Sequence, residues 1–180
     1  YMFLFGGIDF AEETGYSDLY CLNLLTWNWR YVGETGAEIE ARNSHSLGII
    51  SVPAARDVDV TTNFDGSGVK AKNYLVVFGG ASPEKGPLDD TFFALLPSGS
   101  SADIDQALDK DDLFVHWIRQ KQKVSLRGAG PSAREMHGTA LTIDPGASAT
   151  LHGTIIGAPS MVIAGGRGYD TLWADVVAIF

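Results

Sequence analysis

The chain has little cysteine, few basic residues and no long apolar run, and each scarcity argues against a class of protein. Cys21 is the single cysteine among 180 residues, so no intrachain disulfide can form and an intracellular, cytoplasmic location is expected. The 13 Lys and Arg stand against 22 Asp and Glu, for a formal net charge of −9. This charge argues against binding to nucleic acid or to an anionic membrane. No stretch approaches the ~20 apolar residues of a membrane-spanning helix.

Residue patterns typical of catalytic and metal sites are also scarce. No two histidines share a short metal-ligand spacing, and a single cysteine cannot complete a zinc cluster. The serines next to histidines lack the G-x-S-x-G turn of a nucleophile. The acidic run from Asp103 to Asp111 lacks the glycine and glutamate of an EF-hand calcium loop. We therefore expect no catalytic residue, no metal and no cofactor.

The sequence does contain a repeat. Three apolar runs, "YMFLFGG", "YLVVFGG" and "MVIAGG", end in the glycine pairs Gly6-Gly7, Gly79-Gly80 and Gly165-Gly166. Each pair is followed by an acidic-led segment: "SDLYCLNL", "DDTFFALL" or "DTLWADVVAI". In the first two units a tryptophan-bearing segment comes next, and an Arg-x-x-His segment follows it. The tryptophans are Trp27, Trp29 and Trp117, and the Arg-x-x-His pairs are Arg42 with His45 and Arg134 with His137.

This order predicts units of four short strands, which is the architecture of a propeller blade. The sequence resembles the Kelch repeat family, whose mark is an apolar run with Gly-Gly, an aromatic-rich strand, a Trp and a Pro-x-x-Arg-x-x-His opening of the next unit. The resemblance implies an all-β fold, a Kelch-type β-propeller with four-stranded antiparallel blades.

The chain would then be part of one propeller. We expect strands 2 to 4 of one blade at 1–32, a complete blade at 40–124 with insertions at 51–73 and 97–112, and strands 1 to 3 of the next blade at 131–180. A third insertion is expected at Asp144 to Ser160, and a short helix near Ala102 to Asp109. Closed propellers have ~4 to 8 blades, so the remaining blades are expected elsewhere in the parent chain.

The repeated residues are expected to serve the fold. The glycine pairs suit a sharp turn against neighbouring backbone, where glycine takes positive φ without a Cβ penalty. A phosphate site is not favoured, because a strand rather than a helix follows the glycines. The tryptophans are expected to fill the space between blades. His45 and His137 are expected to form hydrogen bonds within their own blades.

A binding site follows from the resemblance alone. In Kelch propellers the first strand of each blade lies beside the central channel, and arginines at its entry can hold an acidic or phosphorylated peptide. This points to Arg42 and Arg134, with Asn43, Ser44 and Ser132 beside them. In the alternative interpretation, both arginines bridge neighbouring blades through buried ion pairs with Asp or Glu.

The expected function is that of a non-catalytic protein-interaction scaffold. It would bind a protein or peptide through loops at one face of the propeller. The alternative is a regulatory or substrate-recruiting propeller arm of a larger enzyme, such as a phosphatase, a methyltransferase or a ubiquitin-ligase adaptor. The sequence identifies neither the partner nor the number of blades.

Overall fold

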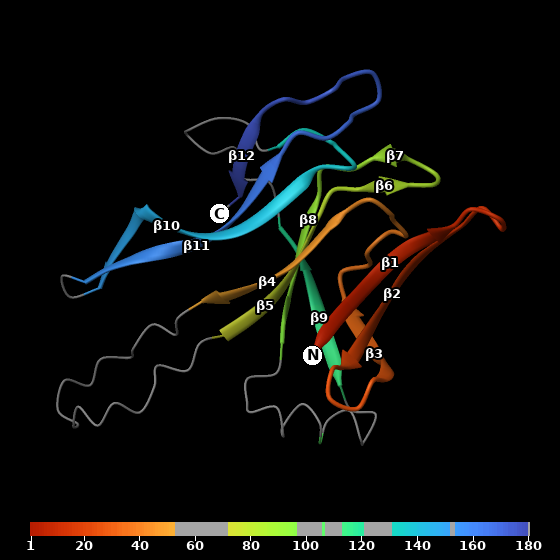
Figure 1. Ribbon diagram of the computed structural model, residues 1–180, viewed down its shortest axis with the longest axis horizontal. Coiled ribbons are helices and arrows are strands. Elements are labelled where there is room, and N and C mark those ends of the chain that lie inside the picture. Colours follow the sequence, from red (N-terminus) through yellow and green to blue (C-terminus); the bar gives the residue numbers. More distant parts are fainter. Residues whose placement is uncertain (53–71, 97–105, 107–112, 121–130, 152–153, 180) are drawn as a thin grey trace.

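The computed structural model describes residues 1–52, 72–96, 106, 113–120, 131–151 and 154–179. These residues form an all-β fold of strands (Figure 1). The strands are β1 (Met2–Asp9), β2 (Thr14–Asn23), β3 (Asn28–Gly36), β4 (Ser46–Val52), β5 (Lys72–Phe78), β6 (Ala81–Ser82), β7 (Gly86–Pro87), β8 (Thr91–Leu95), β9 (Phe114–Arg119), β10 (Gly138–Leu151), β11 (Thr154–Ala164) and β12 (Val176–Ile179). Except for Gln106, the predicted helix lies outside the described residues, as does most of the two expected insertions at 51–73 and 97–112.

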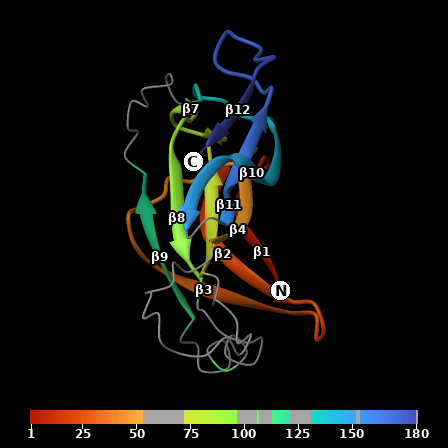
Figure 2. The same ribbon diagram turned by 90° about the vertical axis from the view of Figure 1, so that its left-hand side faces the viewer.

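The strands form one large sheet and two small ones. The seven-stranded sheet has the order β1-β2-β3-β9-β8-β5-β4 and curves into a nearly closed, barrel-like shape. Within it, β1-β2-β3 and β4-β5-β8-β9 are antiparallel groups whose strands are in chain order, with the short β6 and β7 between β5 and β8. The two groups are joined by the parallel pairing of β3 with β9. The remaining strands form the sheets β10-β11-β12 and β6-β7. Figure 1 shows the β4-β5-β8-β9 group between the other two groups, and Figure 2 shows β8 beside β9 along one side of the molecule.

Strand β5 lies at the centre of the packing. Leu75 and Val77 belong to a hydrophobic cluster with residues of β1, β2, β3, β8 and β9. Val76 and Phe78 belong to a second cluster, which contains Met161 of β11. Because successive side chains of a strand point to opposite faces, β5 contributes to both clusters at once. Its continuous apolar run is the sequence signature of a strand that is covered on both faces.

The glycine pairs end β5 and β11 and interrupt β1 at equivalent points. The φ angles of Gly79 and Gly80 are 60° and 90°, in the region that disfavours a side chain. A Cβ on Gly79 would lie 2.8 Å from the Arg134 carbonyl oxygen, and a Cβ on Gly80 would lie 2.5 Å from that of Asn43. Both conformation and space therefore require glycine at this turn, where the segments that precede β4 and β10 approach it closely.

The segment from Asp144 to Ser160 differs from the expected loop. Strand β10 continues to Leu151, β11 begins at Thr154, and the two pair from Gly138↔Ala164 onward as one long hairpin. The pairing shifts between Asp144 and Ala149 and then resumes. The turn residues of "DPGAS" therefore coincide with a local irregularity of the ladder. The β-branched residues that follow favour continued strand.

Trp27 does not occupy a core position, contrary to the expectation from sequence. It lies in the turn between β2 and β3, where its φ is 58° and its side chain is 72% exposed. The side chain of Asn23 holds this turn by accepting hydrogen bonds from the backbone N–H groups of Leu25 and Thr26. Trp29 takes the strand position equivalent to that of the buried Trp117, since Trp29 pairs with Leu22 as Trp117 pairs with Ala94. Its side chain is nevertheless 45% exposed, so the expectation of a packed tryptophan is confirmed for Trp117 and wrong for Trp29 as well as Trp27.

Candidate functional site

Arg42 is buried just before the first strand of the β4-β5-β8-β9 group. A carboxylate, two backbone carbonyls and an aromatic ring surround its guanidinium. Nη1 donates to Asp90 Oδ1 at 2.6 Å and to the Gly79 carbonyl at 3.0 Å, and Nη2 donates to Asp90 Oδ2 at 3.2 Å. Nε donates to the carbonyl of Glu40. The guanidinium carbon lies 5.4 Å from the ring centroid of Phe92. The bidentate geometry and burial make this a strong, oriented ion pair.

Arg134 repeats this arrangement before β10. Its Nη1 donates to Asp175 Oδ1 at 2.6 Å and to the Gly165 carbonyl at 3.0 Å, and Nη2 donates to Asp175 Oδ2 at 3.0 Å. Nε donates to the carbonyl of Ser132. We call each set of arginine, aspartate and glycine carbonyl an arginine clamp. The hydrogen bond from Arg134 holds the pKa of Asp175 below its usual value.

The clamps change the interpretation of both arginines. Arg42 and Arg134 are each 0% exposed, and their donors are engaged by the protein. Direct binding of an acidic peptide by these side chains would require each clamp to open. The ion pairs also differ from the bridging pairs of the alternative, because Arg42 and Asp90 belong to the same antiparallel group. The geometry therefore favours a structural role within each group.

The other expected binding residues lie around the clamps. Asn43 exchanges two backbone hydrogen bonds with Ala81. Ser44 has a positive φ of 51°, and its carbonyl accepts a hydrogen bond from the Met136 N–H. Ser132 is exposed. The structure thus brings these residues near the turns, with Ser132 the one exposed residue of the three.

The two repeated histidines are packed, neutral side chains. Burial, as the larger cause, and the nearby arginine of each clamp together lower the pKa of His45 and His137 to about 4. Their rings meet Phe5 and Phe78 edge-on, with ring centroids 5.4 and 5.2 Å apart. His137 Nε2 forms a 2.8 Å hydrogen bond with Ser46 Oγ of β4, outside its own strand group. This contact corrects the expectation of a bond within the same blade for His137, because β4 and β10 lie close together. For His45, no described residue forms a hydrogen bond with the buried Nδ1.

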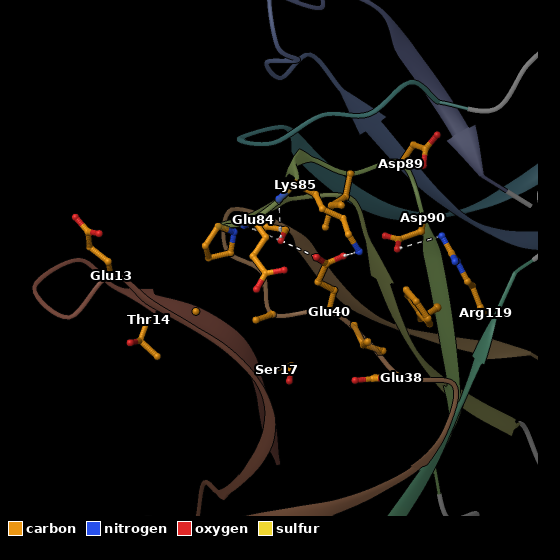
Figure 3. Close-up of a pocket in the computed structure, with 17 residues that line it drawn as sticks. Glu13, Thr14, Ser17, Glu38, Glu40, Glu84, Lys85, Asp89, Asp90 and Arg119 are labelled. Atoms are coloured by element: carbon orange, nitrogen blue, oxygen red, sulfur yellow. Dashed lines mark hydrogen bonds and ion pairs between the residues drawn. The ribbon is translucent and has the colours of Figure 1, made fainter.

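An open groove of about 790 Å³ lies beside the Arg42 clamp (Figure 3). Its walls come from the start of β2, the segment from Glu38 to Ala41, and the turn that includes β6 and β7. These segments are far apart in the sequence, and each ends near the glycine turns. We call this hollow the acidic groove, because six carboxylates line it: Glu13, Glu38, Glu40, Glu84, Asp89 and Asp90.

Two cations line the acidic groove, and both are already paired. Lys85 Nζ lies 2.8 Å from Glu40 Oε2, and Arg119 Nη2 lies 3.6 Å from Asp90 Oδ2 (Figure 3). Burial alone would raise the pKa of Glu40, but hydrogen bonds from Lys85 and Ser82 outweigh it and lower the pKa. Glu40 therefore stays ionised. Glu13, Glu38 and Glu84 are exposed and lie outside both ion pairs, so the groove carries a net negative charge.

Sequence reasoning did not find the acidic groove. Five of its carboxylates come from the short acidic runs "EE", "EIE" and "DD", and Glu84 stands alone in "PEK". Such residues are ordinary in separate turns of an acidic chain. A signal that could have found part of the groove is the placement of Glu38, Glu40 and Glu84, which lie two to four positions from Arg42 or Gly80. Strand pairing brings those turns to one end of the sheet.

Within the described ranges, no group of three or more His, Cys, Asp or Glu side chains could hold a metal ion. The same part of the chain contains no helix long and apolar enough to cross a membrane. A comparison with protein-family models gives no match for this chain, and a comparison with curated proteins gives none either.

Proposed function

We propose that this chain is a non-catalytic protein-interaction scaffold, part of a Kelch-type β-propeller that binds a protein partner at the face carrying the acidic groove. The observation that carries the proposal is the groove itself. It is open and charged, and its walls are turns held by a well-packed sheet. Binding residues are commonly carried by loops positioned on such a rigid scaffold.

The propeller interpretation is supported by internal repetition. Strands β4, β5, β8 and β9 are consecutive antiparallel neighbours, as the four strands of one blade would be. The order β1-β2-β3 matches the last three strands of a blade, and β10-β11-β12 matches the first three. The two arginine clamps occupy the same place in successive groups. Equal contacts at equal positions are what a repeated structural unit predicts.

The charges favour a basic partner. The sequence suggested an acidic peptide held by Arg42 and Arg134, but both guanidinium groups are enclosed by the clamps. The exposed charges of the acidic groove have the opposite sign. Complementary charge accelerates association and selects against partners of like charge. A partner segment rich in Lys or Arg fits this surface.

Affinity capture with a matched charge control tests the proposal. The chain is used as bait beside the double variant Glu38→Gln/Glu84→Gln in the groove and the double variant Glu12→Gln/Asp170→Asn outside it. All four side chains are exposed, so both variants should fold and carry the same change in charge. We expect a partner that the wild type and the outer variant retain and the groove variant loses.

Equal capture by all three proteins would reject the groove as the binding surface. The alternative of a propeller arm within a larger enzyme uses the same surface. The identity of the captured partner therefore separates the two: an enzyme substrate supports the arm, and a structural or signalling protein supports the scaffold.

A further inference from the structure

The segments that follow the first two glycine pairs contact the clamp arginines in the same way, and this equivalence identifies a third position at which a clamp could form. The carbonyl oxygens of Tyr16 and Leu88 each accept a hydrogen bond from the backbone N–H of a clamp arginine, Arg42 at 3.1 Å and Arg134 at 2.9 Å. Asp90 follows Leu88 by two positions, and Asp18 follows Tyr16 by two positions. Asp18 therefore occupies in the first strand group the place that Asp90 occupies in the second.

Asp18 differs from its counterparts because no arginine among the described residues pairs with it. Asp90 and Asp175 each bind both terminal nitrogens of a clamp arginine. In the part of the chain that the structure describes, no Lys or Arg forms a salt bridge with Asp18. Its charged neighbour is another carboxylate. Burial raises the pKa of Glu34, and the negative charge of Asp18 raises it further.

Gly7 independently lacks the histidine contact that its counterparts have among the described residues. A Cβ on its counterpart Gly80 would lie 2.6 Å from His45 Cβ, and one on Gly166 would lie 2.9 Å from His137 Cβ. A Cβ on Gly7 would meet no described atom within 4 Å, although Gly7 keeps the positive φ of the other two, at 119°. The backbone is thus shaped for a contact with an Arg-x-x-His segment that these residues do not supply.

The sheet order leaves room for such a segment. β5 pairs with β8 on one edge and with β4 on the other. Among the described strands, its counterpart β1 pairs only with β2 and ends the seven-stranded sheet (Figure 1). An edge strand presents unpaired backbone donors and acceptors, which an extended segment can use by strand addition.

We propose that the open edge of β1 binds an extended segment carrying Arg-x-x-His, whose arginine pairs with Asp18 and with the carbonyl of Gly6. The arginine would form a third clamp, because Gly6 corresponds to Gly79 and Gly165. The histidine would cover Gly7. The residue two positions after the arginine takes positive φ, as Ser44 and Met136 do. This site does not depend on the acidic groove, which Asp18 does not line.

The occupant comes from outside these 180 residues rather than from a second copy of them. The sequence contains two Arg-x-x-His segments, those of Arg42 and Arg134. Both arginines are fully buried in their own clamps. A second copy would have to break one clamp to fill another, with no net gain in ion pairs.

The chain itself supplies the probe for the test. A fluorescent peptide with the sequence of residues 40–50, "EARNSHSLGII", and the same peptide with citrulline in place of arginine are titrated against the 180-residue chain by anisotropy. Citrulline keeps the shape of arginine and removes its charge. We expect saturable binding of the arginine peptide and at least about tenfold weaker binding of the citrulline peptide, the usual range for a charged hydrogen bond.

Protein variants then locate the site. Asp18→Asn should weaken the arginine peptide at least about tenfold and leave the citrulline peptide unchanged. Glu12→Gln, an exposed acid of the same hairpin, should alter neither, and neither should the groove variant Glu38→Gln/Glu84→Gln. Should Asp18→Asn fail to fold, a photo-crosslinking residue after the histidine of the peptide serves instead. It should label β1 of the wild-type chain.

Three results would overturn the proposal. The first is no binding of the arginine peptide. The second is equal binding of the two peptides, or a loss with Asp18→Asn no larger than with Glu12→Gln. The third is crosslinking to strands other than β1, or self-association of the chain that the peptide displaces, which would assign this edge to a second copy.

Discussion

The two arginine clamps have nearly the same hydrogen bonds but different surroundings. In both, the arginine Nη1 lies 2.6 Å from an aspartate oxygen and the arginine is inaccessible to solvent. The aspartates differ: the side chain of Asp90 is 10% exposed and that of Asp175 is 41% exposed. Asp90 also meets a second cation, Arg119, at 3.6 Å. The comparison teaches that the same contact can contribute differently to the free energy of unfolding at two repeat positions, because the solvent access of the aspartate affects the cost of breaking the ion pair.

The largest effect is expected from breaking the enclosed clamp. Asp90→Asn would leave the buried Arg42 guanidinium without its counter-charge, and removing one partner of a buried pair costs about 3–5 kcal/mol. We expect a loss of this size in the free energy of unfolding, measured by urea denaturation. Glu84→Gln, an exposed acid on the same face, is the control and should stay near wild type. An equally small change in both variants would contradict a structural role for the clamp.

Breaking the second clamp should destabilise the protein less. In Asp175→Asn, water can reach the partly exposed carboxamide at position 175 and partly replace the lost charge beside the Arg134 guanidinium. Urea denaturation of both aspartate variants in parallel gives the comparison directly. If Asp175→Asn proved as destabilising as Asp90→Asn, exposure of the aspartate would not be what distinguishes the clamps.

Acid should weaken the fold through the histidine beside each clamp. His45 and His137 have folded-state pKa values of about 4, below the ~6.5 of an unfolded histidine. The unfolded chain therefore binds more protons between these values. The stability is fully present above pH ~6.5 and falls as the pH drops toward about 4, by up to about 3 kcal/mol for His45.

Urea denaturation at a series of pH values between 7 and 4.5 would check this dependence. The variant His45→Gln should show a flatter profile than the wild type in this interval, because its glutamine does not titrate. Parallel profiles for the two proteins would show that other groups cause the acid sensitivity.

The smallest effect on stability is expected in the acidic groove. Glu84→Gln removes an exposed charge that is in neither ion pair of the groove. We expect a change in unfolding free energy within about 0.5 kcal/mol. Association with a peptide of alternating Lys and Gly should nevertheless slow, and the difference from wild type should shrink with added salt. Stopped-flow fluorescence at two salt concentrations would measure this, and salt-independent slowing would point to a change of structure.

The sequence predicted the repeated positions better than their partners. The glycine pairs and the Arg-x-x-His segments stand out because similar short patterns recur along the chain. The pairing of Arg42 with Asp90 could not be found this way, since it depends on which strands lie side by side. Trp27 and Trp29 are two positions apart, so period-two alternation alone does not separate them. The turn set by Asn23 decides that Trp27 lies outside the strand.

The long hairpin and the acidic groove were missed for different physical reasons. The residues of "DPGAS" have turn preferences that the pairing of β10 with β11 overrides. The groove is formed by segments that tertiary structure brings together, and no local pattern records that meeting. Structural features that repeat along the chain can thus be predicted from this sequence, whereas a site formed between distant turns cannot.

Strand β5 has a consequence for the way the protein unfolds. Its residues alternate between the two hydrophobic clusters, so neither cluster can lose β5 without exposing apolar side chains of the other. The two clusters should therefore melt together as a single cooperative unit, in which the backbone amides of β5 exchange their hydrogens only on global unfolding. A substitution that loosens one hydrophobic cluster should therefore also weaken the packing of the other cluster, through β5.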